Sequence, residues 1–124
     1  MRLGDLVGDA PFVCGPDTTI REAALAMEGS DLGSLAVVEG MELVGLVTER
    51  DLRRAVAETI DPESPVSGIM SVEPDTFDPD LDVWDAATWI ADSGYRHLPV
   101  IDDEGSLLGV VSIRDLLVAV INTV

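Results

Sequence analysis

The sequence GLVTERDL occupies residues 45–52, and a close copy, GVVSIRDL, occupies residues 109–116, 64 positions later. In both copies a glycine opens a short apolar run, a hydroxyl residue ends it, and an aspartate follows three positions later. This order predicts a buried strand that leads directly into a helix, with the hydroxyl residue and the aspartate forming a capping box. The repetition indicates that the chain is built from two copies of one unit.

The hydroxyl and carboxylate pairs, Thr48 with Asp51 and Ser112 with Asp115, have two compatible interpretations. As capping boxes they stabilise a helix start by about 1 kcal/mol each. A strand that feeds a helix also gathers free N–H donors and the positive end of the helix dipole at one place, which suits a phosphate or a polar ribose. The motif alone leaves both interpretations open.

The patterns that flank the two octets repeat in the same order. An apolar stripe at residues 83, 86, 87 and 90 repeats the stripe at 20, 23, 24 and 27 with an offset of 63, and one extra turn residue moves the later offset to 64. The punctuation Asp-Pro-Glu-Ser-Pro at 61–65 separates the copies. We therefore expect a mixed α/β (α+β) fold of two β-α-β-β-α repeats, 1–62 and 63–124. At about 60 residues each is small, so the two should pack together with pseudo-two-fold symmetry. The first repeat should place its elements at 2–7, 12–14, 19–29, 35–38, 43–47 and 49–58.

The charge of the chain is unusual. It has 24 acidic residues against seven arginines and no lysine, and a formal net charge of −17. Such a density repels itself at ordinary ionic strength, whereas at about 1 M salt the Debye length is about 3 Å and the repulsion is screened. We interpret the acidity as adaptation to a very salty cytosol, and hence expect an extremely halophilic source. The same charge argues against binding to nucleic acid or to an anionic membrane.

Several other classes of protein lack support in the sequence. There is no Ser/His/Asp or Cys/His order, no zinc spacing and no P-loop, so we expect neither an enzyme with catalytic residues nor a metal site. The acidic stretch 78–82 resembles a calcium loop, but Val83 and Trp89 stand where such a loop needs glycine and glutamate. The longest apolar run, 116–121, is too short to span a bilayer, and no signal peptide opens the chain. We expect a cytoplasmic protein with a single, buried thiol at Cys14.

The two octets, with the strands that precede them at 35–38 and 96–101, resemble the two motifs of a CBS domain pair. The family is named after cystathionine β-synthase, and the tandem is also called a Bateman module. The resemblance covers nearly the whole chain and implies a stand-alone regulatory module. Such pairs bind adenosine-containing ligands (AMP, ADP, ATP or S-adenosylmethionine) in two clefts between the motifs and need no further cofactor.

The resemblance implies a role for each matching residue of the octets. Asp51 and Asp115 correspond to the aspartate that binds the ribose, since a carboxylate can accept from both ribose hydroxyls. Thr48 and Ser112 would lie near the ribose or phosphate. The natural contacts for an anion follow from the few cations of the chain: Arg50, Arg96, His97 and Arg114.

The resemblance also implies that the two clefts differ. In the family the adenine lies against the first strand of the other motif, where a threonine often contributes. Thr76, followed by Phe77, matches that position, whereas the first half has Val13. The cleft with Thr48, Asp51 and Thr76 therefore keeps the pattern, and the cleft with Ser112, Asp115 and Val13 departs from it.

A further pair of positions also differs between the halves. Arg96 and His97, ahead of Pro99, match a basic pair that meets phosphates in the family, where the first half has Gly33 and Ser34. Structural alternatives stay open for the lone histidine, for local ion pairs of the arginines, and for Gly45 and Gly109 as places of close backbone approach.

The second half carries apolar residues that its helices do not need for their own core. Trp84 and Trp89 lie off the apolar stripe, and the last helix is apolar almost all round, which calls for a partner surface. As CBS pairs associate through their helices, we expect a homodimer through Trp84, Trp89, Leu117, Val118 and Ile121. The leading hypothesis is a ligand sensor that signals to an unidentified protein. The alternative is a structural or dimerisation module with degenerate, unoccupied clefts.

Overall fold

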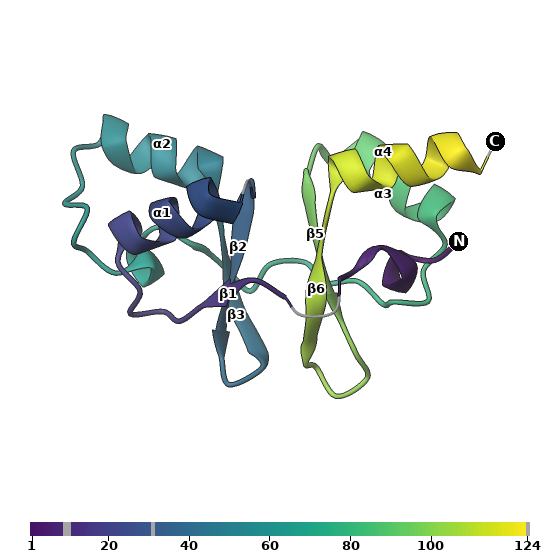
Figure 1. Ribbon diagram of the computed structural model, residues 1–124, viewed down its shortest axis with the longest axis horizontal. Helices are drawn as coiled ribbons and strands as arrows, with labels where there is room; N and C mark the ends of the chain where they lie inside the picture. The colour runs from purple at the N-terminus through teal and green to yellow at the C-terminus, as the bar shows by residue number, and fades with distance from the viewer. Residues whose placement is uncertain (9–10, 31, 124) are drawn as a thin grey trace. The chain divides into compact units, whose positions relative to one another are not determined.

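The computed structural model describes residues 1–8, 11–30 and 32–123, and the chain divides into two compact units (Figure 1). Unit 1 consists of Met1–Pro11 and Asp75–Val124, and unit 2 of Phe12–Pro74. These bounds differ from those of the sequence repeats, 1–62 and 63–124, because each repeat contributes its opening segment to the unit formed by the other repeat.

Unit 2 is a four-stranded sheet with two helices. Its strands follow the order β1-β2-β3-β4, with β1 parallel to β2 and the other neighbours antiparallel. Helices α1 and α2 lie on one face of this sheet in Figure 1. The short strand β4 was not predicted from the sequence. The elements are β1 (Val13–Cys14), α1 (Ile20–Ser30), β2 (Ser34–Glu39), β3 (Glu42–Thr48), α2 (Glu49–Ala57), the 3-10 helix η2 (Val66–Gly68) and β4 (Ser71–Val72).

Unit 1 repeats this plan with fewer strand residues. Its strands β5 and β6 pair antiparallel, and Phe77 forms a parallel bridge with Val100. Cys14 pairs with Val37 in the same way in unit 2, so this bridge reproduces the predicted offset of 63. The elements are the 3-10 helix η1 (Leu3–Leu6), α3 (Val83–Ser93), β5 (His97–Ile101), β6 (Leu107–Ser112) and α4 (Ile113–Asn122). The predicted mixed fold of two related motifs is confirmed.

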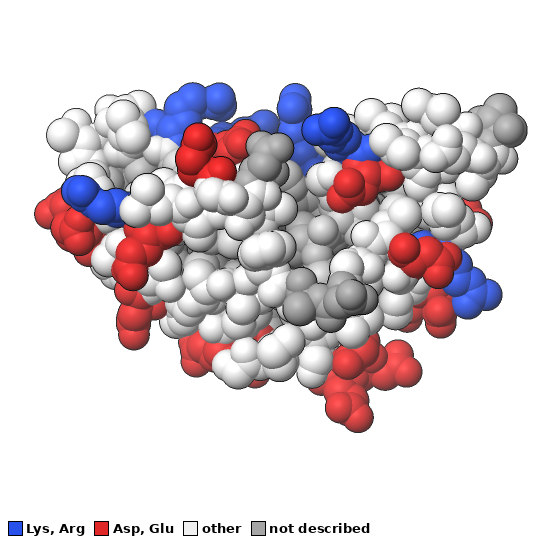
Figure 2. All heavy atoms as spheres, viewed as in Figure 1, with Lys and Arg blue, Asp and Glu red and all other residues white. Residues whose placement is uncertain are grey.

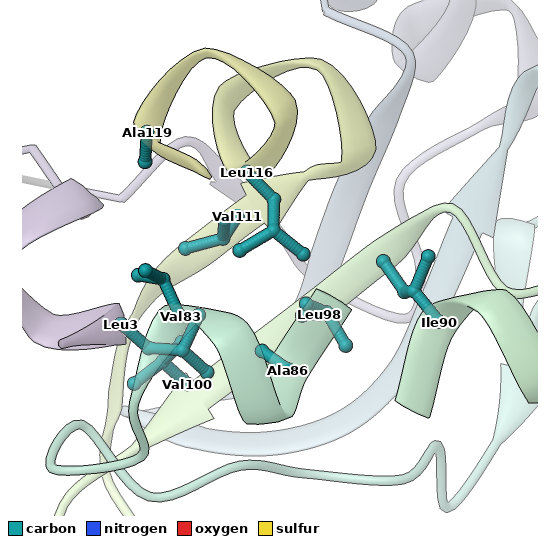
Figure 3. Close-up of a cluster of buried hydrophobic side chains, with 9 residues drawn as sticks. All are labelled: Leu3, Val83, Ala86, Ile90, Leu98, Val100, Val111, Leu116 and Ala119. Carbon is teal, nitrogen blue, oxygen red and sulfur yellow. The ribbon is translucent and has the colours of Figure 1, made fainter. Parts of the chain in front are cut away.

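The opening segments complete the two cores reciprocally. Leu3 is fully buried in the core of unit 1, and its N–H donates to the carbonyl of Leu81 at 2.9 Å (Figure 3). Val66, 63 positions later, is fully buried in the core of unit 2, and its N–H donates to the carbonyl of Thr18 at 2.8 Å. Burial of a side chain of this size contributes about 2 kcal/mol.

The helix starts follow the predicted capping chemistry. Ahead of α1, Thr19 Oγ1 accepts from the N–H of Glu22 at 3.0 Å, and the Glu22 carboxylate accepts from the N–H of Thr19 at 3.0 Å. The bonds from Thr19 lower the pKa of Glu22. None of the helices in the described ranges is long and apolar enough to cross a bilayer.

The thiol of Cys14 is half-buried, whereas the sequence predicted a buried one. Cys14 lies on the two-residue edge strand β1, which pairs only with β2 among the described residues. This partial burial raises the pKa of the Cys14 thiol, against a smaller lowering by a hydrogen bond with Thr18.

The glycines that open the two octets allow close packing. A Cβ added at Gly45 would collide with the side chain of Met70, and a Cβ added at Gly109 would lie 3.0 Å from Cβ of Val7. Close approach to a neighbouring segment is therefore what glycine provides at both positions.

We predict that Gly109→Ala destabilises the protein more than Gly45→Ala. Val7 is short and branched at Cβ, so it cannot yield without its backbone moving, whereas the flexible Met70 side chain can change rotamer. Overpacking of this kind typically costs about 1–3 kcal/mol. Urea unfolding of both variants in molar KCl measures the difference. Equal losses would show that Met70 is as rigidly held as Val7.

Candidate functional site

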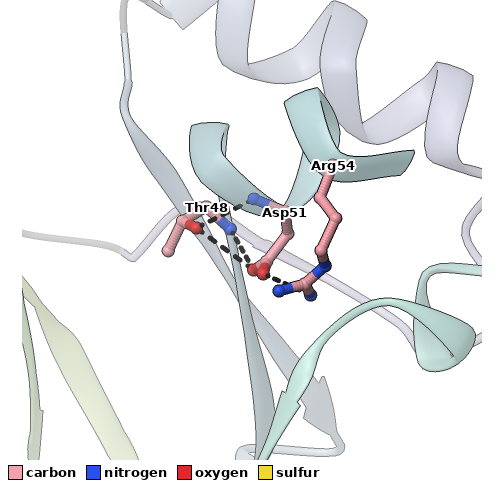
Figure 4. A network of polar contacts seen from close by, with 3 residues as sticks. All are labelled: Thr48, Asp51 and Arg54. Atoms are coloured by element: carbon pink, nitrogen blue, oxygen red, sulfur yellow. Dashed lines mark hydrogen bonds and ion pairs between the residues drawn. The ribbon is translucent and has the colours of Figure 1, made fainter. Parts of the chain in front are cut away.

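The clearest polar site lies where strand β3 runs into helix α2. Thr48, in extended conformation at the end of the strand, caps the helix, and Asp51 lies in its first turn. The N–H of Thr48 donates to Asp51 Oδ2 at 2.9 Å, and Thr48 Oγ1 lies 3.1 Å from the same oxygen (Figure 4). In return the N–H of Asp51 donates to Thr48 Oγ1 at 3.3 Å. The predicted capping box is confirmed.

The second carboxylate oxygen of Asp51 has a cationic partner. Arg54 Nη2 donates to Asp51 Oδ1 at 3.1 Å from one turn further along α2. The Asp51 side chain is only 6% exposed, whereas the Arg54 side chain is 55% exposed. A carboxylate has about four acceptor positions, and the described residues supply three donors to this one. One acceptor position on Oδ1 is therefore left without a donor among the described residues.

The equivalent pair in unit 1 is looser. Ser112 caps α4, its Oγ accepts from the N–H of Asp115 at 3.1 Å, and its own N–H reaches Asp115 Oδ2 at 3.4 Å. Asp115 is exposed, whereas Asp51 is the one buried charged residue among those described. The residue 64 positions after Arg54 is Val118, so Asp115 has no arginine one turn further along its helix.

Arg50 and Arg114, at the second helical position of α2 and α4, are both exposed. In the part of the chain that the structure describes, neither forms an ion pair, so local pairing of these two arginines is not observed. Both guanidinium groups can therefore meet an external anion without breaking an internal contact.

The remaining predicted residues are divided between the units. In unit 2, Val13 is 40% exposed on β1 and pairs with Ala36. In unit 1, Thr76 is exposed and the ring of Phe77 is half-buried. Thr76 thus belongs to a different compact unit from Thr48 and Asp51, and its participation in their site stays a prediction.

The predicted basic pair of unit 1 adjoins its capping box. His97 pairs with Ser112 across the β5–β6 ladder, and the carbonyl of Arg96 accepts from the N–H of Ile113 at 2.8 Å. Pro99 is fully buried, and its carbonyl accepts from the N–H of Phe77 at 2.9 Å. The structure thus places the second-motif residues in unit 1, and their roles toward a ligand stay predictions.

Two features of the site region were not predicted. Arg54 was overlooked, although its spacing from Asp51, three positions on a helix, is one that allows an ion pair. The second feature is an aromatic cluster in unit 1. Trp89 stacks on Tyr95 at 5.2 Å between centroids and meets Phe77 edge-on at 4.7 Å. Tyr95 directly precedes Arg96, so the cluster lies beside the predicted basic pair in the sequence.

Comparison with known proteins identifies the repeat. A model of the CBS domain matches residues 3–58 and 66–122. The chain is 42% identical over 106 residues to an uncharacterized 17.7 kDa protein of Acidianus ambivalens, covering 85% of this chain and 64% of that protein. It is 38% identical over 104 residues to the CBS domain-containing protein YhcV of Bacillus subtilis, covering 83% and 74% of the two chains. The chain thus spans less than two thirds of the length of the Acidianus relative.

The fold also matches a solved structure over nearly its full length. A CBS domain protein of Pyrobaculum aerophilum, complexed with AMP, superposes with a TM-score of 0.87 and 29% identity, covering 98% of this chain and 99% of that one.

We predict that Asp51→Ala is more destabilising than Asp115→Ala. The first substitution removes the acceptor of three hydrogen bonds, one of them from a guanidinium, at a buried position, which costs about 1–3 kcal/mol. The second removes one long bond at an exposed position, which costs about 0.5 kcal/mol or less. Urea unfolding of the two variants in molar KCl, side by side with the unsubstituted protein, tests this ranking. A larger loss for Asp115→Ala would contradict it.

Proposed function

Because the chain belongs to the CBS domain family, we propose that it is a regulatory module that binds an adenosine-containing ligand and signals to a partner protein. The observation that carries the proposal is the buried Asp51 carboxylate, fixed at a helix start with one acceptor position open. A ribose hydroxyl is a donor of the kind that this position accepts. The AMP complex of the Pyrobaculum protein supports an adenosine ligand.

The helix start offers complementary chemistry for the rest of such a ligand. The positive end of the α2 dipole favours a phosphate, and Arg50 adds a guanidinium that is exposed. We propose AMP, ADP or ATP as ligands, with S-adenosylmethionine as the other adenosine compound to be tested. The clefts between the motifs are their proposed location.

We propose unequal occupancy of the two motifs. The site of Thr48 and Asp51, with Thr76 against the adenine, would bind more tightly than the site of Ser112 and Asp115, with Val13 in place of the threonine. The exposure of Asp115 and the long bond to its carboxylate support this ranking, because a poorly held acceptor must be ordered when the ligand binds.

A structural module with unoccupied clefts is the second candidate. It is favoured by the three hydrogen bonds that Asp51 already accepts within α2 and β3. Those bonds give the aspartate a role in stability without any ligand.

We predict saturable binding of an adenosine ligand that depends on Asp51. Calorimetric titration in molar KCl with AMP, ADP, ATP and S-adenosylmethionine in turn should give heat with at least one of them. Asp51→Ala should weaken that ligand at least about tenfold, since hydrogen bonds to a charged group are lost, whereas Asp115→Ala leaves the tighter site intact. No heat from any of the four, with the protein folded, would favour the structural module.

We further propose that the protein is a homodimer that associates through α3 and α4. Trp84, Leu117, Val118 and Ile121 are between 48% and 69% exposed. Trp89 instead packs against the core of unit 1 and stacks on Tyr95, so its contribution to an interface would be smaller. A chain with a net charge of −17 repels its own copies through its acidic surfaces. A surface of uncharged residues is therefore the one best suited to self-association.

We predict that Ile121→Glu converts the dimer to a monomer while the fold is retained. The substitution places a carboxylate in the proposed interface, where burial without a partner is costly. Val56→Glu, at an exposed apolar position of α2, is the matched control. Sedimentation equilibrium in molar KCl gives the mass of each variant. A monomeric unsubstituted protein, or equal weakening by both substitutions, would contradict the proposed interface.

A further inference from the structure

Helices α2 and α4, which begin within the two octets, differ most at the arginines of α2. Figure 2 shows arginine side chains over this helix. Arg50 has a counterpart in Arg114, but Arg53 and Arg54 correspond to Leu117 and Val118, 64 positions later. Arg53 and Arg54 are therefore the two cations that α2 has and α4 lacks, while Glu49 of α2 corresponds to the uncharged Ile113.

Only one of these two arginines forms an ion pair with the carboxylate of Asp51. Arg54 Nη2 lies 3.1 Å from Asp51 Oδ1, the oxygen with the open acceptor position (Figure 4). Arg53 is exposed and, among the described residues, has no ion pair. The two neighbours thus form a natural pair for comparison, with equal charge and different positions relative to Asp51.

We propose that Arg54 makes the first-motif site selective for adenosine ligands that carry a phosphate over uncharged or cationic adenosine ligands. This inference rests on the proposed function, since it concerns the ligand that Asp51 holds by its ribose. It assigns the choice among adenosine ligands to the guanidinium beside the ribose-binding carboxylate.

The selection follows from the structure of the ligands. The 3′ hydroxyl and the 5′ carbon are attached to neighbouring carbons of the ribose ring, so a guanidinium beside the carboxylate that holds this hydroxyl would be within reach of the 5′ group. In AMP this group is a phosphate, which a guanidinium binds through charge-assisted and often bidentate hydrogen bonds. In adenosine it is a neutral hydroxyl. In S-adenosylmethionine it is a sulfonium, whose positive charge Arg54 repels.

The exposure of Arg54 allows this contact without loss of the Asp51 bond. More than half of its side chain is accessible, and a guanidinium has five N–H donors, of which Asp51 takes one. The other donors can serve a phosphate while Nη2 stays on the carboxylate. Arg54 therefore acts as a specificity-determining residue as well as a partner of Asp51.

The test compares Arg54→Val with Arg53→Val. Valine is the residue that the second motif has at the position of Arg54, and both substitutions remove one positive charge from α2. Both are made in an Asp115→Ala background so that binding reports on the first-motif site. Calorimetric titrations with AMP, adenosine and S-adenosylmethionine in molar KCl give three affinities for each variant.

We predict that Arg54→Val lowers the ratio of AMP affinity to adenosine affinity about five- to tenfold, since hydrogen bonds to a charged group are lost, whereas Arg53→Val leaves it nearly unchanged. The affinity for S-adenosylmethionine relative to adenosine should rise in Arg54→Val. The ratios separate selection from positioning, because a displaced Asp51 would weaken all three ligands through the shared ribose.

Two results would overturn the inference while the proposed function stands. One is equal binding of AMP and adenosine by the protein with Arg54 intact. The other is an equal change of the ratio in the two valine variants. If the folded protein with Arg54 intact binds none of the three ligands, the proposed function itself fails, and the inference fails with it.

Discussion

Neither sequence repeat completes its own hydrophobic core. Leu3 of the first repeat is fully buried in unit 1 with residues of the second, and Val66 of the second repeat is fully buried in unit 2 with residues of the first. Backbone hydrogen bonds fix both exchanges. A motif of about 60 residues has little core to spare, so each unit depends on a segment from the other repeat. The pair of motifs, not the single motif, is therefore the unit of stability.

The same capping chemistry occurs in both motifs, but the aspartates that form it lie in different environments. Thr48 and Ser112 both cap a helix, and the carboxylates of Asp51 and Asp115 accept a hydrogen bond from the N–H of the capping residue. Only Asp51 is buried and paired with an arginine. The capping box fixes where the carboxylate lies, whereas its burial and the neighbouring charge differ between the motifs. Repetition of the motif therefore does not repeat the environment of its carboxylate.

Local patterns were sufficient to predict most of the fold. The octets, the apolar stripes and the turn residues place the strands and the long helices, because period and capping depend on neighbouring residues. The reciprocal exchange of Leu3 and Val66 could not be predicted, since it depends on contacts between segments far apart in sequence. The half-burial of Cys14 likewise depends on β1 being an edge strand.

For the candidate site, too, local sequence patterns predicted the capping residues but not their tertiary environment. The motif identifies Thr48, Asp51 and their counterparts, but the burial of Asp51 follows from tertiary packing. The spacing of three positions between Asp51 and Arg54 allows an ion pair on a helix. The sequence nearby also holds other carboxylates, such as Glu49 and Glu58, that an arginine on this helix could meet. The choice of Asp51 became clear only from the side-chain geometry.

The burial of Asp51 affects how strongly salt weakens the Arg54–Asp51 ion pair, one of few ion pairs that a chain with seven arginines can form. The pairs Arg2–Asp80 and Arg21–Glu63 are at least 60% exposed on both sides, so molar salt screens them and they contribute little. The carboxylate of Asp51 is shielded from solvent, so ions screen its interaction with Arg54 less. An electrostatic preference for a phosphate can persist at a salt concentration that suppresses contacts on the open surface. Burial of one partner would thus preserve, in a strongly acidic protein, the selectivity for an anion that we propose.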